Sequence, residues 1–523
     1  MKVDPDTLHV DTPNHLLWSR ANFEEAMPGV LTPLSWSFWG HCAEASSRRI
    51  YVEKMGAFAP GELTDGLADT TAGLFYGRAA VNVDLLRRVL ERIPGTDADA
   101  LELQILGRVR DGAAPTRNWS RAPHVLARVP LNIALVPRRI RALRADVDAW
   151  WHRSTSSDPA DLADAARLLL EARSRFTDAC TEHGFNVFVG QAGYDQLAKL
   201  AAAAGLPGLE LSLSASGRGT EETAMIEDLW AAAAGRSTVD EIVGRHGYHG
   251  PDEGEVSSRS WREDRSPLLA LLDRYRVAGS ARQINTPAER ATAEAKLLAS
   301  LPRARRMQAR LVLRFVDTFI PLREVGKAAF LQCIDVGRHA AHRAGDLLTA
   351  DGRLDDPDDI RFVTVEEIVA GTVDPARVEQ RRAQRTALLA LEFPDAFVGV
   401  PEPWDRPGRT ASPPAGTDPV VRGIAASPGT HTGVARVIHD SDDYDRLDPG
   451  DVLVCELTDP GWTPLFAVAG ACVIDIGGPL SHGAIVAREL GIPCVIGTGD
   501  GSARITDGTR VVVDGDRGEV VAC

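Results

Sequence analysis

The sequence predicts a multidomain protein with a mainly α-helical body and a C-terminal α/β (β/β/α) domain. Three observations predict this class. The chain has 523 residues, which is more than one ordinary domain holds. Residues 119–400 are rich in Ala, Leu, Arg and Glu, with apolar residues at helical spacing. Beyond residue 420 the pattern changes to short β-branched runs separated by turn residues, which predicts strands at 435–438, 451–455, 472–476, 494–496 and 510–513.

We predict three segments along the chain. Residues 1–400 form the helical body, with a sub-boundary near residue 115. Residues 401–419 hold six prolines and few apolar residues, so we expect an extended, semi-rigid linker. Residues 420–523 form the C-terminal domain, which contains seven Arg, no Lys and fifteen Asp or Glu. The three segments therefore differ in composition as well as in predicted secondary structure.

The overall composition is typical of a soluble globular protein, with 44% hydrophobic and 25% charged residues. The formal net charge of −15 argues against nucleic acid or an anionic membrane as the main partner. The sequence has neither the apolar run of a signal peptide nor one long enough for a membrane helix. Its seven cysteines form no CxxC pair. We therefore expect a cytoplasmic protein with reduced thiols.

The most specific motif of the chain surrounds His482 and reads GGPLSHGAIVARELGIP from residue 477 to residue 493. Gly478 belongs to a Gly-Gly pair that ends a predicted buried strand and permits a tight turn. Ser481 is a good helix N-cap, so we expect His482 in the first helical turn. There the unpaired backbone N–H groups and the helix dipole favour an anion. A neutral imidazole is a competent nucleophile, so His482 could accept a phosphoryl group. For an isolated histidine, a capping or solvated role is the ordinary alternative.

This motif resembles the phosphohistidine swivelling domain, or mobile domain, of the phosphoenolpyruvate-utilising enzyme family. The segments GIAASPG at 423–429 and TDPGWTP at 458–464 are also similar to that family. The resemblance implies that His482 is a phosphohistidine that carries a phosphoryl group between two sites while the domain moves on its linker. It further implies that the phosphate is bound or neutralised by Ser481, Gly478 and Arg488. Taken alone, Arg488 could equally be a charge on the helix surface.

The order of helical body, linker and swivelling domain resembles the rifampicin phosphotransferase and phosphoenolpyruvate-synthase-like proteins. The body carries this resemblance at residues 21–35, 245–251, 260–264 and 323–327. The resemblance implies that the body binds an acceptor molecule and that the Arg and Lys of the last segment help the transfer.

Arg323 and Lys327 are the two residues that match this Arg and Lys. On a helix they share one face with Arg338 and His342. Charge-assisted contacts from Arg and Lys suit phosphoryl transfer, so this face could bind phosphate. The alternative is a solvated basic face paired with acidic neighbours.

His246 and His249 lie close to several acidic residues, which could suggest a metal site. Gly and Pro run through the segment, so we expect no helix to place both histidines on one face, and we predict no metal site in this chain. His246 could instead deprotonate the hydroxyl of an acceptor. A loop histidine that orders its own backbone is the alternative.

Residues 27–35 contain two prolines and a glycine, so we expect an ordered loop there rather than regular helix. The aromatic residues that follow could line an apolar acceptor pocket or pack in the core. Thr32 and Trp36 are our candidate substrate contacts in this segment.

No segment visible in this sequence could phosphorylate His482. The chain has no G-x-x-x-x-G-K-[ST] loop and no room for the ATP-grasp domain or the phosphoenolpyruvate-binding barrel of the resembling families. We therefore expect a separate ATP-grasp subunit that uses ATP, with Mg²⁺ bound at that partner.

The leading hypothesis is a phosphotransferase component that carries a phosphoryl group on His482. The group would come from the ATP-grasp subunit and pass to a hydroxyl of a small organic acceptor held by the body. One alternative is a phosphorylation-responsive regulator or interaction protein without acceptor chemistry. Another is a phosphorylation-coupled dehydratase, in which the phosphorylated hydroxyl is eliminated.

Overall fold

The structure, a computed structural model, describes residues 6–20, 27, 29–106, 109–110, 118–214, 221–279, 287–405, 420–439, 441–458, 460–478 and 481–523. The predicted sub-boundary near residue 115 and residues 406–419 of the predicted linker lie outside these residues. The chain divides into two compact units. Unit 1 comprises residues 1–188, 254–258 and 325–407, and unit 2 comprises residues 189–253, 259–324 and 408–523.

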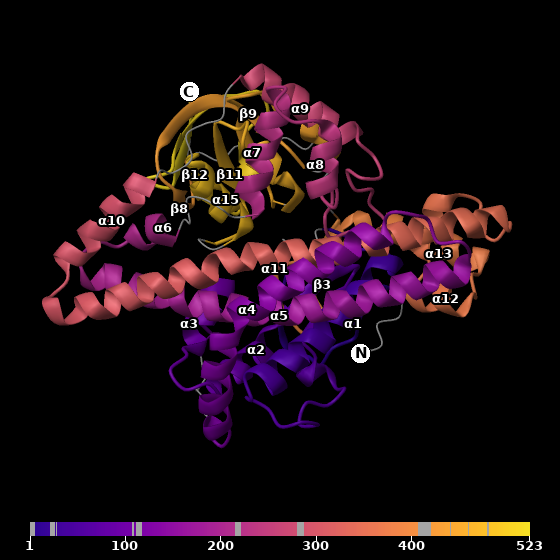
Figure 1. Cartoon of the computed structure of the whole chain (residues 1–523), viewed down its shortest axis with the longest axis horizontal. Helices are drawn as coiled ribbons and strands as arrows, with labels where there is room; N and C mark the ends of the chain where they lie inside the picture. The colour runs from indigo at the N-terminus through magenta and orange to yellow at the C-terminus, as the bar shows by residue number, and fades with distance from the viewer. Residues whose placement is uncertain are drawn as a thin grey trace. The chain divides into compact units, whose positions relative to one another are not determined.

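Unit 1 consists of helices and small antiparallel sheets (Figure 1). Its larger sheet has the strand order β2-β3-β1-β5, made of β1 (Leu17–Ser19), β2 (Ala72–Phe75), β3 (Arg78–Asn82) and β5 (Ala396–Val398). A second pair joins β4 (Leu391–Glu392) to β6 (Trp404–Asp405). The helices that belong to this unit alone are α1 (Pro33–Arg49), α2 (Val83–Glu91), α3 (Ala98–Leu106), α4 (Ala122–Ser154), α12 (Val365–Ala370) and α13 (Pro375–Leu389).

Helix α1 shows that the expectation of a loop over residues 27–35 was wrong for its last part. The helix begins at Pro33, and Thr32 is its N-cap, whose hydroxyl accepts a hydrogen bond from the backbone N–H of Ser35 at 3.1 Å. A proline in the first helical position has a suitable φ and no N–H to leave unpaired, so it starts a helix instead of breaking one. The aromatic residues that follow therefore lie on α1.

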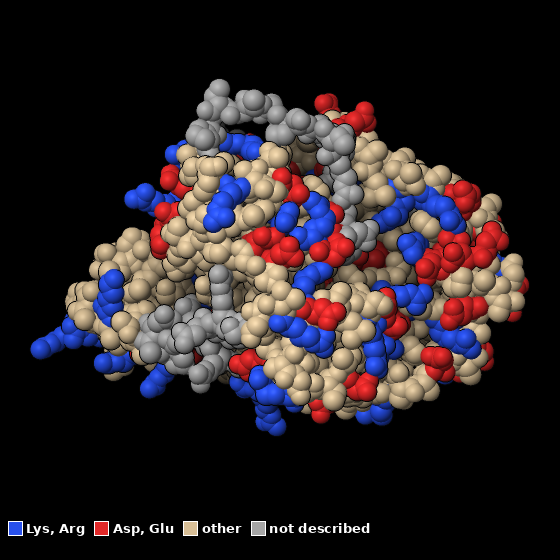
Figure 2. Space-filling view, turned by 90° about the horizontal axis from the view of Figure 1, so that it is seen from above, with Lys and Arg blue, Asp and Glu red and all other residues tan. Residues whose placement is uncertain are grey.

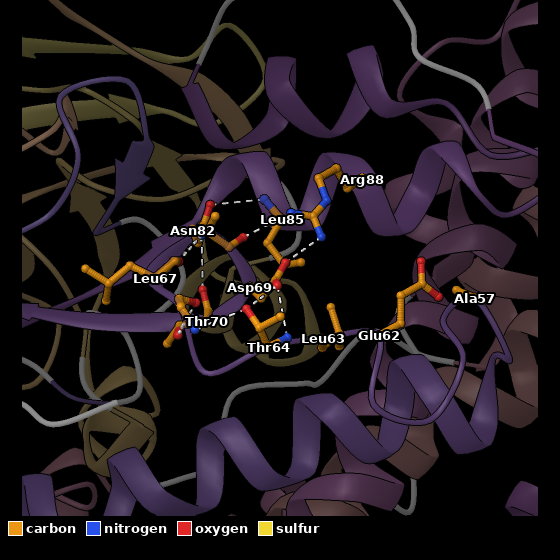
Figure 3. A network of polar contacts seen from close by, with 12 residues as sticks. Ala57, Glu62, Leu63, Thr64, Leu67, Asp69, Thr70, Asn82, Leu85 and Arg88 are labelled. Atoms are coloured by element: carbon orange, nitrogen blue, oxygen red, sulfur yellow. Dashed lines mark hydrogen bonds and ion pairs between the residues drawn. The ribbon is translucent and has the colours of Figure 1, made fainter.

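The N-cap residue of helix α2, Asn82, binds the loop that precedes β2 (Figure 3). The side-chain oxygen of Asn82 accepts the N–H of Leu85 at 3.0 Å, and its amide nitrogen donates to the carbonyls of Leu67 and Thr70 at 3.1 Å each. One turn further on, Arg88 donates to Asp69 at 2.7 Å. The loop before β2 is thus fixed to the first two turns of α2.

Helices α5 (Leu162–Ala203) and α11 (Arg303–Ala350) each contribute residues to both units. Unit 2 also contains α6 (Leu209–Ser214), α7 (Glu221–Ala233), α8 (Val239–His246), α9 (Ser266–Ala278) and α10 (Pro287–Ser300). Among the described residues, no helix combines the length and the apolar composition that a membrane span needs. On the face shown in Figure 2, basic and acidic side chains are interspersed among uncharged residues.

The C-terminal domain contains an eight-stranded sheet with the order β7-β14-β13-β9-β10-β11-β12-β8. Strands β9 to β12 pair in parallel, and the other pairs are antiparallel. The central strands β10 and β11 are buried throughout, as expected for parallel strands covered on both faces. This confirms the predicted α/β class. The strands are β7 (Val420–Arg422), β8 (Ile424–Ser427), β9 (Thr430–Val437), β10 (Val452–Cys455), β11 (Ala471–Ile474), β12 (Cys494–Ile496), β13 (Arg510–Asp514) and β14 (Glu519–Ala522).

The C-terminal domain shares a hydrophobic core with helices α7, α8 and α9 (Figure 1). Buried residues such as Trp230 of α7 and Leu272 of α9 belong to the same cluster as Ile474 at the end of β11. The hydroxyl of Tyr275 on α9 donates to the carbonyl of Pro464 in the C-terminal domain at 3.1 Å. These contacts seat the domain on the three helices and thereby define the surroundings of its helix α15 (His482–Leu490).

In unit 1 the side chain of Arg381 is 2% exposed, and its two terminal nitrogens donate to the carboxylate of Glu367 at 2.7 and 2.9 Å. Burial raises the pKa of Glu367, but the hydrogen bonds from Arg381 and from the backbone N–H of Thr364 outweigh it, so the pKa lies below its ordinary value. A carboxylate with a lowered pKa stabilises the folded state above the unfolded value and loses this contribution on acidification.

We therefore expect unit 1 to lose stability as the pH falls below 4.5, the ordinary value for this carboxyl. At neutral pH, Arg381→Met should lower the free energy of unfolding by about 3 kcal/mol, because it leaves a partly buried carboxylate without its partner. Urea unfolding from neutral pH to about pH 3 measures both effects. A wild-type stability that rises on acidification would contradict this account.

Candidate phosphoryl-transfer site

Helix α15 begins at His482, at the position that the sequence predicts for a helix start. Ser481 is the N-cap and accepts a hydrogen bond from the backbone N–H of Ala484 at 3.4 Å. The helix ends at Gly491, which adopts the left-handed conformation with φ 63°. The backbone of His482 therefore lies among the N–H groups of the first turn, which have no partner within the helix.

The imidazole of His482 is buried, with 5% of the residue exposed. Its Nε2 lies 2.9 Å from the hydroxyl of Thr463, the first residue of α14 (Thr463–Phe466). Its Nδ1 lies 3.7 Å from Oε1 of Glu222, in the first turn of α7. The two ring nitrogens thus face different partners, one in the C-terminal domain and one on a helix of the body.

Gly483 lets α15 approach its neighbours closely. A Cβ at this position would lie 2.7 Å from Cδ1 of Ile474 and 2.9 Å from the hydroxyl of Thr458. Gly478, in the loop before the helix, differs in this respect, because a Cβ there would meet nothing within 4 Å. Gly478 therefore leaves room beside its backbone, and its role in phosphate binding stays a prediction.

Arg488 lies in the interior of unit 2 and not on the helix surface. It is 3% exposed and donates to the carbonyl of Ala426 at 3.1 Å. Burial lowers the pKa of this guanidinium, Tyr194 raises it, and the nearby charge of Arg323 lowers it. Arg323 of α11 therefore lies near enough to Arg488 for its charge to act on that guanidinium.

The four residues predicted to share one face of α11 fall into two groups. Arg338 donates to the carbonyl of Glu255 at 3.1 Å, and Nε2 of His342 lies 3.1 Å from the carbonyl of Ser257. These two side chains thus hold the segment 254–258 by its backbone. Lys327, only 8% exposed, lies one helical turn beyond Arg323.

Thr32 and Trp36, the candidate substrate contacts, both lie in buried surroundings at the start of α1. The hydroxyl of Thr32 donates to the carboxylate of Glu255 at 2.9 Å in addition to capping the helix. Trp36 is 7% exposed and lies close to Gly40 one turn further along α1, where a Cβ would lie 2.9 Å from the indole. Both side chains have structural contacts, and their contact with a substrate stays a prediction.

His246 is the last residue of α8 and not a loop residue, which corrects the expectation drawn from the sequence. Its Nε2 lies 2.8 Å from Oδ2 of Asp228 on α7, and its Nδ1 is buried without a hydrogen-bond partner. Burial lowers the pKa of His246, and the hydrogen bond to Asp228 raises it less, so the net shift is downward. If Nε2–H donates to Asp228, Nδ1 has a free lone pair, as a general base requires.

His249 pairs separately with Glu253, and its ring centroid lies 6.3 Å from that of His246. The described part of the chain contains no group of three His, Cys, Asp or Glu side chains that could hold a metal ion. The two histidines therefore form two acid–histidine pairs side by side.

Comparison with known families identifies the two parts of this site. Residues 447–518 match the model of the PEP-utilising enzyme mobile domain. The C-terminal domain is a PEP-utilising mobile domain. Residues 193–324 match the model of the rifampicin phosphotransferase fourth domain. His482 thus belongs to the mobile domain, whereas Glu222, Asp228 and His246 belong to the fourth domain.

Several curated proteins are similar to the chain over part of their length. A rifampicin phosphotransferase of Streptomyces sp is 31% identical over 319 residues, which cover 58% of this chain and 36% of that protein. The prodigiosin synthesizing transferase PigC of Serratia marcescens is 32% identical over 288 residues, which cover 53% and 32%. The uncharacterized phosphotransferase YvkC of Bacillus subtilis is 35% identical over 187 residues, which cover 34% and 22%. The chain thus spans well under half the length of each relative.

Sequence reasoning did not select Thr463, Glu222 or Asp228 for the site. Thr463 lies in the TDPGWTP segment that resembles the mobile domain, so the motif contained a signal for it. Glu222 and Asp228 lie on α7 outside any motif, and each meets its histidine only through the tertiary fold.

We expect Gly483→Ala to destabilise the mobile domain by about 1–3 kcal/mol, because the added methyl group overlaps Ile474 and Thr458. Gly478→Ala is the matched control and should leave the stability unchanged, since the space there is open. Urea denaturation followed by circular dichroism compares the two. Equal stabilities of the two variants would contradict the close approach of α15.

NMR titration of His246 should give a midpoint below the ordinary value of 6.5. Asp228→Asn should lower the midpoint further, because the carboxylate stabilises the protonated ring. Asp240→Asn removes an exposed carboxylate from α8 and should leave the midpoint unchanged. A midpoint that rises in Asp228→Asn would contradict the pairing.

Proposed function

We propose that the chain is a phosphotransferase component in which His482 carries a phosphoryl group to a hydroxyl of a small organic acceptor. The observation that carries this proposal is the position of His482 at the start of α15 in a PEP-utilising mobile domain, with Nε2 beside the Thr463 hydroxyl. Relatives named rifampicin phosphotransferase and phosphotransferase support phosphoryl transfer as the type of reaction.

In the charging step, Nε2 of neutral His482 attacks a phosphorus atom of the phosphoryl donor, and the bond from that phosphorus to the donor's oxygen breaks. The donor leaves with the electron pair of that bond. The backbone N–H groups at the start of α15 and the residues Ser481 and Gly478 then support the phosphate. Arg488 is a buried residue in the last turn of the same helix, and its positive charge lowers the cost of a negative charge nearby. These roles explain why the histidine lies at a helix start.

In the transfer step, the hydroxyl oxygen of the acceptor attacks phosphorus while the Nε2–P bond breaks. We propose that Nδ1 of His246 takes the hydroxyl proton, oriented by Asp228. Arg323 and Lys327 neutralise charge on the moving phosphoryl group. The charge of Arg323 acts on Arg488 in α15, so Arg323 lies on the part of α11 that is near α15. Thr32 and Trp36 remain our candidates for binding the rest of the acceptor.

The phosphoryl donor is proposed to be ATP, bound with Mg²⁺ on a separate ATP-grasp subunit. The sequence contains no P-loop motif that could take over this step. The acceptor is proposed to be a small molecule with a reactive hydroxyl group.

After incubation with ATP and desalted lysate of the native host, the wild-type protein should gain one acid-labile phosphoryl group, as measured by intact mass. His482→Ala should gain none, because it lacks the nucleophile. His431→Ala is a matched control in the same mobile domain and should be phosphorylated like wild type, since His431 binds a backbone carbonyl. Phosphorylation of His482→Ala to the wild-type extent would refute the carrier role. The small-molecule fraction of the lysate is then added back to the phosphorylated protein, and transfer to none of its components would favour a regulator.

A further inference from the structure

We propose that Glu222 of the fourth domain is a positioning residue for phosphoryl departure from His482. By holding a proton on Nδ1, it lets the imidazole leave phosphorus as a neutral ring. The inference rests on the proposed function and extends it, because it assigns a role in the transfer to a residue outside the mobile domain.

The two nitrogens of His482 have partners of different chemistry. Nδ1 faces the Glu222 carboxylate at 3.7 Å, and a carboxylate oxygen can only accept a hydrogen bond or stabilise a positive charge. Nε2 faces the Thr463 hydroxyl at 2.9 Å, and a hydroxyl can donate. At 3.7 Å the Glu222 carboxylate acts on Nδ1 through its charge and not through a hydrogen bond. The arrangement that both partners favour places the proton on Nδ1 and the lone pair on Nε2.

Burial strengthens this preference. Glu222 is 4% exposed and His482 is 5% exposed, so water screens little of their interaction. Glu222 also lies in the first turn of α7, where the helix dipole favours a negative charge. A carboxylate in the first turn of a helix commonly stabilises only the helix. The experiment must therefore measure the tautomer of His482 itself.

The chemical consequence concerns the leaving group. When an acceptor oxygen forms its bond to phosphorus, the electron pair of the Nε2–P bond returns to Nε2. With a proton on Nδ1, the product is neutral imidazole, whereas without it the product is a much more basic imidazolide anion. The acceptor proton goes to the base, and the proton on Nδ1 stays where it is. Glu222 can hold the proton on Nδ1 only while the mobile domain contacts the fourth domain. The contact therefore favours departure of the phosphoryl group at this site.

The experiment compares the full-length wild type with Glu222→Gln and with Glu227→Gln. Glu227 lies on the same helix and is exposed, so its substitution makes the same change in charge away from the histidine. Nitrogen-15 NMR of the labelled His482 ring gives the tautomer of the unphosphorylated protein. Phosphoramidate, a small phosphoryl donor, then charges the histidine, and intact mass follows the loss of the phosphoryl group to solvent.

We expect wild type and Glu227→Gln to hold the proton on Nδ1 and to lose the phosphoryl group at equal rates. Glu222→Gln should show a mixture of tautomers and lose the group at least about 10-fold more slowly, within the range of general acid–base effects. A tautomer and a rate in Glu222→Gln that match those of Glu227→Gln would overturn the inference. If phosphoramidate and the charging lysate both fail to phosphorylate His482 in wild type, the proposed function fails, whereas the tautomer comparison still decides whether Glu222 orients the ring.

Discussion

The rest of the site depends on how the two nitrogens of one buried imidazole are held. Nε2 of His482 has a partner within its own domain, Thr463, and Nδ1 has a partner on α7, Glu222. The first contact lies within the mobile domain, and the second joins that domain to the fourth domain. Local features place the ring for both contacts: the N-cap Ser481 starts the helix, and Gly483 lets it lie close to Ile474.

Apolar packing, as well as the contact between Glu222 and His482, holds the mobile domain against the fourth domain. Its sheet and helix α15 share a single apolar cluster with α7, α8 and α9, and Tyr275 adds a hydrogen bond to Pro464. If the domain leaves these helices to collect a phosphoryl group, the shared apolar surface becomes exposed, which is unfavourable. A charging partner would therefore need to cover comparable surface, whereas return to the fourth domain would be favoured by burial.

The sequence predicted most of what depends on local pattern. The GGPLSHG motif predicted the start of α15 at His482, and β-branched runs predicted the central strands of the mobile domain. The expectation of a loop over residues 27–35 is wrong from Pro33 onward, because a proline in the first turn supports a helix instead of breaking it.

What the sequence could not predict are the partners that meet across long distances in the chain. Glu222 and His482 are separated by the rest of the fourth domain, the last part of the body and the whole linker, and no spacing rule connects them. Arg338 and His342 lie on the same helix as Arg323, but they bind backbone carbonyls of the segment 254–258. Helical periodicity gives the face of a residue and not the group that it meets.

The most direct test of the central claim is phosphorus–nitrogen correlated NMR of the charged, nitrogen-15 histidine-labelled protein. The account predicts one phosphoryl group per chain, bonded to Nε2 of His482, with Nδ1 carrying a proton. A phosphoryl group bonded to oxygen, to another histidine or to Nδ1 of His482 would contradict it.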